Sequence, residues 1–238
     1  MVVALAFVAT VVSTLFAQAM LARYTQGHRS QDGAWALALG MFALASVALA
    51  TGTATGWDNG TFRVFYLFGA VLDVPWLALG SVYLLAAHTI GNRIRLGLLV
   101  FSGFAAGVLV SAPMETVYGT HIPVGKDVFG ALPRVLAAAG SGVGAVVIIG
   151  GAVYSAARFA RDRSAPGNAR LAGANILIAL GTVVLSSGGF VQGVIGHDEA
   201  FTASLAVGIT VIYGGFLLTA TRGGEARVFQ GSLPVKGG

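Results

Sequence analysis

The chain contains no cysteine among its 238 residues. This absence excludes disulfide bonds, thiolate metal sites, iron–sulfur clusters and a cysteine nucleophile. It also means that the sequence carries no information on the redox state of the compartment. Histidine is scarce as well, with four residues in the whole chain, so histidine-based chemistry has few candidates.

Charged residues make up only 10% of the chain, whereas a soluble domain usually has about 25%. Hydrophobic residues make up 56%, and the mean hydropathy is +0.82. This composition predicts an integral membrane protein. The nine carboxylates leave little material for acid–base chemistry, which disfavours an enzyme.

Seven apolar segments are long enough to cross a bilayer, which takes about 20 helical residues. The first is not read as a secretion signal, because no Lys or Arg precedes it. We therefore expect an all-α, polytopic membrane protein with seven transmembrane helices. Residues 1–222 would form the bundle, and residues 223–238 a short cytoplasmic tail. The predicted spans are 2–22, 34–54, 62–87, 95–112, 129–157, 170–194 and 200–221.

The fourteen Lys and Arg residues are distributed unevenly between the two sides. Eleven lie in the loops after the first, third and fifth helices or in the tail, and three lie on the other side: Arg63, Lys126 and Arg134. Positively charged short loops stay in the cytoplasm, so the N-terminus is expected outside and the C-terminus inside. Basic loops at an anionic inner leaflet also account for the net charge of +5, and nucleic-acid binding is not expected.

Two short motifs suggest an internal repeat. LALG at 37–40 recurs as IALG at 178–181, and GWD at 56–58 is matched by GHD at 196–198. These matches relate helices one to three with helices five to seven and leave the fourth as a linker. The halves would then form a 3+1+3 parallel repeat about an axis along the membrane normal. Chance matches in a sequence rich in Ala, Gly, Leu and Val are the alternative.

Asp73 is the one carboxylate placed deep inside a predicted span, about halfway along 62–87. An intramembrane Asp costs about 2.5–3.5 kcal/mol on insertion scales and normally faces the bundle interior or water. Pro75 removes a helical hydrogen bond beside it and is expected to kink the helix, and Trp76 follows. This group predicts a polar pocket at mid-membrane. Asp73 would be either a proton-relay or ligand-binding acid, or a protonated residue with a structural role.

The repeat also suggests partners for Asp73. Its counterpart on the seventh span is Tyr213, which makes Tyr213 the first candidate, followed by Ser46, Ser186 and Ser187. No histidine in these helices has a second histidine three or four residues away, so haem ligation is not expected. We expect no metal site and no cofactor.

Other polar and small residues indicate packing rather than chemistry. Gln18 and Gln192 are expected to form interhelical hydrogen bonds. The glycine-rich motif at 140–144 has no preceding strand, which a nucleotide loop requires, so it predicts close helix packing. A charged group on the outer side is interpreted as a solvated loop, with a cation-attracting vestibule as the alternative; it comprises Glu115, Lys126, Asp127, Asp198 and Glu199.

The segment 63–85, with RVFY, PWLALG and YLL in order, resembles a block in uncharacterised seven-helix membrane proteins of bacteria, in particular actinobacteria. That resemblance implies no activity. The architecture also resembles microbial rhodopsins, whose third helix has an acidic residue and a proline. Residues 202–221 contain no lysine, however, so a retinal Schiff base cannot form there. Sugar-exporting SWEET transporters have a similar 3+1+3 arrangement, but their Pro-Gln motif is absent.

The favoured hypothesis is a non-enzymatic bundle that acts as a sensor or as an accessory scaffold, with a polar pocket around Asp73. A small-solute or proton-coupled transporter with a midplane site between parallel repeats is the alternative. The expected location is the bacterial plasma membrane, as a multi-pass protein. Its expected partners are the lipid bilayer and either another membrane protein or a second copy of the chain.

Overall fold

The computed structural model describes residues 1–161 and 168–220, and all the spans lie in these ranges. The predicted tail at 223–238 lies outside the described residues. The helices are α1 Val2–Gly27, α2 Ser30–Thr55, α3 Asn59–Phe65, the π-helix η1 Tyr66–Leu72, α4 Asp73–Leu85, α5 His88–Ser111, α6 Gly125–Val128, α7 Ala131–Arg161, α8 Asn168–Ile195 and α9 Asp198–Ala220.

Seven helical segments are long and apolar enough to span a membrane, as predicted. The third span is one continuous rod, Asn59–Leu85, made of α3, η1 and α4. The fourth span begins at His88 rather than near residue 95, so Arg93 and Arg95 lie within α5 instead of in the preceding loop. Helical hydrogen bonding continues past the apolar run because polar side chains are tolerated where a helix leaves the hydrocarbon.

Short connections end several spans abruptly. His28 closes α1 in the left-handed conformation at φ 48°, and its N–H donates to the Tyr24 carbonyl at 2.7 Å. Gly56 follows α2 at φ 101°, a conformation that glycine adopts readily because it has no Cβ. Asp58 then caps α3, accepting hydrogen bonds from the backbone of Gly60 and Thr61. These turns force consecutive spans to run in opposite directions.

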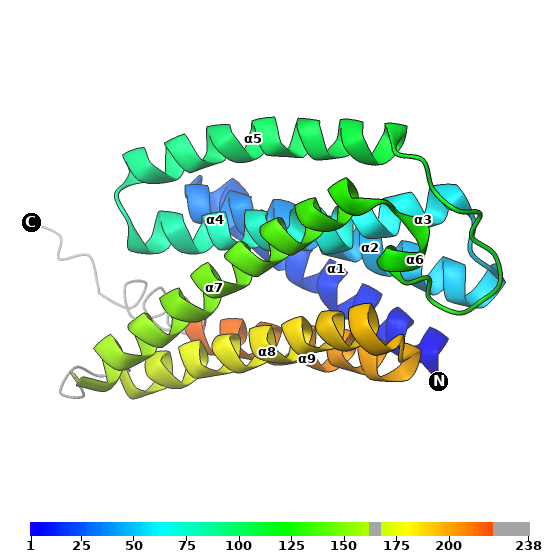
Figure 1. Cartoon of the computed structure of the whole chain (residues 1–238). Helices are drawn as coiled ribbons and strands as arrows, with labels where there is room; N and C mark the ends of the chain where they lie inside the picture. The colour runs from blue at the N-terminus through cyan, green and yellow to red at the C-terminus, as the bar shows by residue number, and fades with distance from the viewer. Residues whose placement is uncertain (162–167, 221–238) are drawn as a thin grey trace, which may run out of the picture.

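Six of the spans form a closed ring of contacts, and the fourth lies outside it (Figure 1). Within the ring, α1 packs on α2 and α9, α2 packs on the third span, the third span packs on α7, and α8 packs on both α7 and α9. The helix α5 lies along the outer side of η1 and α4, with a smaller contact to α7. The third span is therefore enclosed by α2, α5 and α7.

Small residues form the seams between helices. At the crossing of α8 and α9, a Cβ on Gly181 would lie 2.8 Å from the Gly208 carbonyl, and one on Gly208 would lie 2.9 Å from the Gly181 carbonyl. Backbones that approach this closely gain dispersion energy in a membrane, where no hydrophobic force drives helices together.

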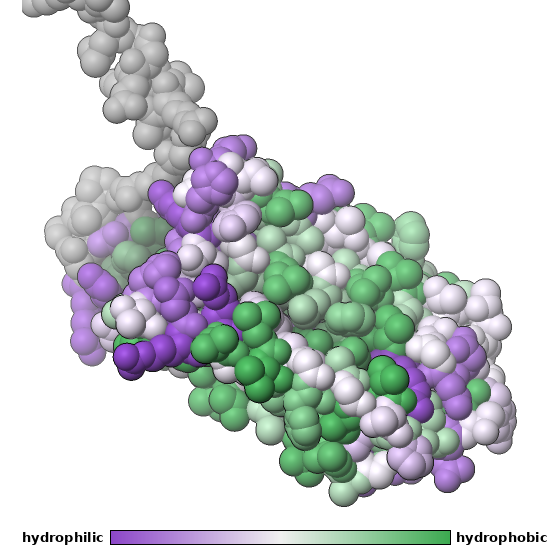
Figure 2. Space-filling view, turned by 90° about the horizontal axis from the view of Figure 1, so that it is seen from above, coloured by the Kyte–Doolittle hydropathy of each residue, from purple (hydrophilic) through white to green (hydrophobic). Residues whose placement is uncertain are grey.

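The surface has the pattern of a membrane protein. Figure 2 shows hydrophobic residues across the middle of one face and hydrophilic residues gathered at both ends. Large apolar side chains such as Val110, Val146 and Phe190 are among the most exposed. One end, called here the arginine-rich end, carries Arg23, Arg29, Arg93, Arg95, Arg158, Arg161 and Arg170, whereas the opposite end carries Arg63, Lys126 and Arg134.

Candidate functional site

The middle of the third span departs from α-helical geometry. Over Tyr66–Leu72 the backbone is π-helical, and the Asp73 N–H donates to the Phe68 carbonyl, five residues back. Pro75 supplies the cause: it has no N–H, and its ring would clash with the Val71 carbonyl of a regular helix. Such π-turns are rare and often occur at functional sites. The sequence predicted a kink at Pro75, and the structure has a wider turn just before it.

The helix α7 lies directly against this irregular turn. The Ser141 hydroxyl donates to the Ala70 carbonyl at 2.6 Å. Gly140 is so close that an added Cβ would lie 2.7 Å from the Val71 carbonyl oxygen, and one on Gly144 would lie 2.9 Å from a Val74 methyl carbon. The glycine-rich motif at 140–144 therefore serves close helix packing, as predicted, and its serine bonds a backbone carbonyl of the turn.

Asp73 and Trp76 both lie on α4 just after the turn. Asp73 is 7% exposed, and its Oδ1 accepts a hydrogen bond from the Val74 N–H at 2.6 Å. Trp76 is 5% exposed, and its indole N–H donates to the Ser102 hydroxyl of α5 at 3.1 Å. Both side chains are therefore buried in the third span, on the same helix and one turn apart.

The other predicted pocket residues lie elsewhere. Tyr213 stacks with Phe16 and Phe216 between α1 and α9. Ser46 is buried in α2, whereas Ser187 is exposed on α8 and donates to the Val184 carbonyl of its own helix. Within the described residues, no hydrogen bond joins Asp73 to Tyr213. The five predicted pocket residues therefore do not line one site: Trp76 lines the groove described next, and Asp73 does not.

A groove that sequence analysis did not predict opens beside Trp76, with a volume of about 580 Å³. Its floor is α2 and its walls are α1 and α4, with Arg95 of α5 at the arginine-rich end. Trp76 lies at the end of the groove toward the middle of the bundle. Tyr83 lies nearer the other end, at the arginine-rich end of the protein, and this end is called here the mouth. The sequence signal that could have located the groove is the run of small residues on α2, namely Gly33, Ala36, Gly40 and Ala43.

A chain of hydrogen bonds joins two residues that line the groove, Tyr83 and Ser30. Tyr83 donates to Asn92 Oδ1 at 2.9 Å, the Asn92 amide nitrogen lies 3.2 Å from His88 Nδ1, and His88 Nε2 lies 2.9 Å from Ser30 Oγ. The chain thus joins α2 to α4 and α5 through the His88 ring, with Ser30 on one ring nitrogen and Asn92 on the other.

An ion pair between a partly exposed arginine and a buried carboxylate lies close to the mouth of the groove. Asp32, in the first turn of α2, is 2% exposed and lies 3.7 Å from the Arg23 guanidinium. Arg23 also stacks over the Phe216 ring, 5.0 Å from its centroid. The pair neutralises the one described carboxylate near the mouth, so the unpaired charge there is positive.

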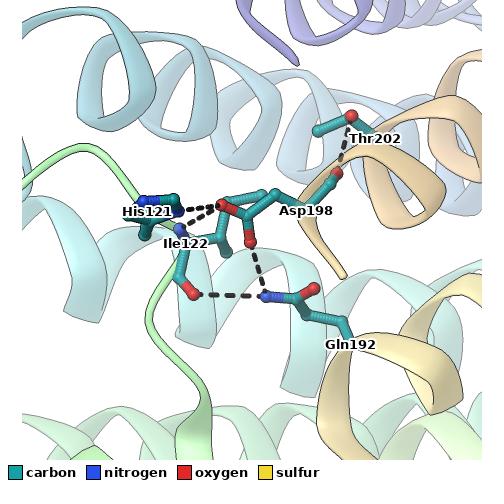
Figure 3. Close-up of polar contacts among 5 residues, drawn as sticks. All are labelled: His121, Ile122, Gln192, Asp198 and Thr202. Carbon is teal, nitrogen blue, oxygen red and sulfur yellow. Dashed lines mark hydrogen bonds and ion pairs between the residues drawn. The ribbon is translucent and has the colours of Figure 1, made fainter. Parts of the chain in front are cut away.

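At the opposite end, Asp198 holds the loop between α5 and α6 against α8 and α9 (Figure 3). Its carboxylate accepts from the Ile122 N–H at 3.0 Å and from the Gln192 amide at 3.2 Å, and it lies 3.2 Å from His121. Gln192 also donates to the Ile122 carbonyl. Gln192 thus bonds both the loop and the first residue of α9. Asp198 belongs to the charged group that was interpreted as a solvated loop, but its carboxylate is hydrogen-bonded within the protein.

Outside the spans, one carboxyl has a shifted pKa. The Thr61 hydroxyl, which donates to Asp58, lowers the pKa of the Asp58 carboxyl, and backbone hydrogen bonds from Thr61 and Gly60 act in the same direction. Asp58 therefore acts as the N-terminal cap of α3. Within the part of the chain that the structure describes, no group of three His, Asp or Glu residues could hold a metal ion.

Comparisons with protein-family models, with curated proteins and with solved structures return no match for this chain.

Proposed function

We propose that the protein is a non-enzymatic, sensor-like membrane bundle in which the groove receives a ligand and the irregular third span responds to it. The observation that supports this most strongly is the position of Trp76. Its ring lines the groove, its N–H bonds α5 through Ser102, and it lies one helical turn from Asp73 at the junction of the π-helix and α4. A molecule in the groove would touch the third span at Trp76, four residues after the last residue of the π-helix, Leu72.

The packing around that junction favours a two-state element. On the α7 side, Gly140 and Ser141 contact the turn closely, so movement there is restricted. On the groove side, Gly40 has no atom within 4 Å of an added Cβ, so space remains. A π-turn that tightened to α-helix would rotate Trp76 relative to the preceding residues. A ligand that contacts the two arrangements differently would bias their populations.

Chemistry at this site has little support. Asp73 has no second carboxylate or histidine bonded to it in the described part of the chain, so no acid–base pair is formed there. An accessory role, in which the bundle transmits the change to a partner membrane protein, is compatible with the same geometry. We place the protein in the bacterial plasma membrane with its N-terminus outside and its arginine-rich end in the cytoplasm, because basic short loops are retained there.

Hydrogen–deuterium exchange tests the sensor hypothesis. The protein in nanodiscs would be exposed in turn to oleate, oleylamine and monoolein, which share a tail and differ in head charge. We expect at least one probe to change exchange over residues 66–74, and Gly40→Leu to remove this response by filling the groove. The matched control is Gly103→Leu, at an α5 position that is equally open but outside the groove. Unchanged exchange with all three probes would eliminate the proposal.

A transporter is the second candidate function, and the pattern of helix contacts favours it. In the repeat, α1 corresponds to α7, α2 to α8, and the third span to α9. Each contact of the ring then has a counterpart: the α1–α2 contact corresponds to α7–α8, the α2–α4 contact to α8–α9, and the α1–α9 contact to α7–α4. The fourth span lies outside, as a linker would. This supports a 3+1+3 parallel repeat, in which the halves could move against each other.

Proton flux separates the transporter from the sensor. Proteoliposomes with a trapped pH dye would compare the protein with Asp73→Asn, which keeps the side-chain shape. Transport predicts flux that collapses in the variant, and a sensor predicts no flux in either case. Flux that persists in the variant would remove Asp73 from the transport mechanism.

A further inference from the structure

We infer that the groove is a binding site for an anionic phospholipid, with the phosphate at Arg95 and Ser30 and one acyl chain lying along α2 beside Trp76. This inference names the class of ligand for the proposed sensor. Its effect on the third span rests on the proposed function, whereas binding of the lipid can be measured independently. Three features of the groove support it: its length, the charge at its mouth and the polar side chains that line it there.

The length and floor of the groove suit an acyl chain. Lining residues on α2 run from Ser30 to Ala43, which is about 20 Å at 1.5 Å per residue. One leaflet contributes about 15 Å of hydrocarbon, so the groove reaches from the arginine-rich end to mid-membrane. Its α2 floor consists mainly of small residues together with the exposed Leu37, and the exposed Leu21 lies on the α1 wall.

The mouth of the groove is positively charged. Arg95 lines it and makes no ion pair with any carboxylate of the described residues, and His28 lies beside it. Asp32, the nearby acid, is paired with Arg23. A negative headgroup would therefore be attracted, whereas the ammonium of a cationic amphiphile would meet an unpaired guanidinium. Arginine also bonds phosphate through two N–H groups at once.

The hydrogen-bond chain holds a second polar group beside the groove. Ser30 lines the groove, and its Oγ lies 2.9 Å from His88 Nε2. A serine hydroxyl can donate as well as accept, so a phosphate oxygen at the mouth would accept from Ser30 and from Arg95. The bonds from Tyr83 to Asn92 and between Asn92 and His88 fix the His88 ring beside Ser30.

Native mass spectrometry tests the inference on the full chain. The purified protein would be mixed with equal amounts of dioleoyl phosphatidylglycerol and dioleoyl phosphatidylcholine, which have the same tails. We expect phosphatidylglycerol to be retained preferentially. Arg95→Gln should reduce that preference about fivefold, the effect of one basic residue at a membrane surface. Arg93→Gln is the control, because Arg93 has the same charge on the same helix but does not line the groove.

A second pair of variants tests whether the acyl chain lies along α2. Gly40→Leu should abolish retention of phosphatidylglycerol, and Gly103→Leu should not; both positions have room for the side chain, so folding is expected to survive. Equal retention of the two lipids, equal effects of Arg93→Gln and Arg95→Gln, or retention that survives Gly40→Leu would each overturn the inference. So would a dimer that Gly40→Leu disrupts while no lipid is bound, which would assign the groove to a second copy.

These results are separable from those for the proposed function. Preferential phosphatidylglycerol binding without any exchange response at residues 66–74 would retain the lipid site and reject the sensor. An exchange response to oleylamine or monoolein without a preference for the anionic lipid would retain the sensor and reject this ligand.

Discussion

Gly140 and Gly142 offer a matched test of how α7 supports the irregular turn. Both glycines lie in α7, two residues apart, and each can be replaced by alanine. A Cβ on Gly140 would lie 2.7 Å from the Val71 carbonyl oxygen and 3.2 Å from Pro75 Cγ, whereas a Cβ on Gly142 would meet nothing within 4 Å. The first contact is with backbone, so the helices themselves must separate to relieve it.

The expected magnitude follows from two opposing effects. Alanine favours a helix over glycine by roughly 0.5–1 kcal/mol, and this gain is common to both variants. Forcing extra atoms into a packed contact costs about 1–3 kcal/mol, and only Gly140→Ala incurs this cost. Gly142→Ala should therefore be slightly stabilising, and Gly140→Ala should be less stable than Gly142→Ala by about 1–3 kcal/mol.

The assay is unfolding by sodium dodecyl sulfate from a mild detergent, followed by circular dichroism. Circular dichroism needs no label, which suits a chain without cysteine. Hydrogen exchange should also increase over residues 66–74 in Gly140→Ala and remain unchanged in Gly142→Ala. If the two variants are equally stable, α7 does not support the turn in the way that the contact distances indicate.

Three further predictions concern the ends of the bundle. Asp198→Ala should cost about 1–3 kcal/mol, because it leaves the buried Ile122 N–H unpaired, whereas Glu199→Ala should have little effect; equal unfolding free energies would contradict this. The lowered pKa of Asp58 means that its carboxylate stabilises the fold above the unfolded-state pKa, and that this stability is lost as the pH falls through the folded-state pKa. Acid titration of Asp58→Ala should show a shallower loss of stability, and an unchanged profile would rule out the cap as its source. In intact spheroplasts, a membrane-impermeant maleimide should label Thr120→Cys, on the outer side, and not Thr25→Cys, on the inner side. The reverse pattern would reject the proposed orientation.

Much of the fold could be predicted because the bilayer imposes a length on each helix. The seven spans follow from apolar runs of about 20 residues. An irregularity in the third span was expected from Pro75 in an apolar run, although as a kink rather than a π-turn, and the burial of Asp73 followed from the cost of a carboxylate in hydrocarbon. Each of these predictions rests on one segment alone.

What could not be predicted depends on pairs of helices. A lipid-facing residue such as Val146 is as apolar as a buried one such as Ile148, so hydropathy does not distinguish the inward face of α7 from its outward face. The exposed position of Ser187 and the stacking of Tyr213 on Phe16 were therefore beyond reach. The groove was missed for the same reason, since its lining comes from four helices and small residues alone predict packing as readily as a cavity.

Replacing Asp73 would test whether this residue is retained for the stability of the bundle or for its function. Its carboxylate is buried, and among the described residues its one hydrogen bond comes from the adjacent Val74 N–H, so little offsets its cost. Asp at a helix centre costs about 2.5–3.5 kcal/mol on insertion scales, whereas Leu is favourable by about 0.3–0.6 kcal/mol. Asp73→Leu should therefore stabilise the bundle, by up to about 3 kcal/mol once the lost Val74 bond is allowed for. Stability gained together with a lost exchange response would mean that Asp73 is retained for function. Loss of stability on detergent unfolding would instead make Asp73 a structural residue, and the mid-membrane carboxylate would no longer support either proposed activity.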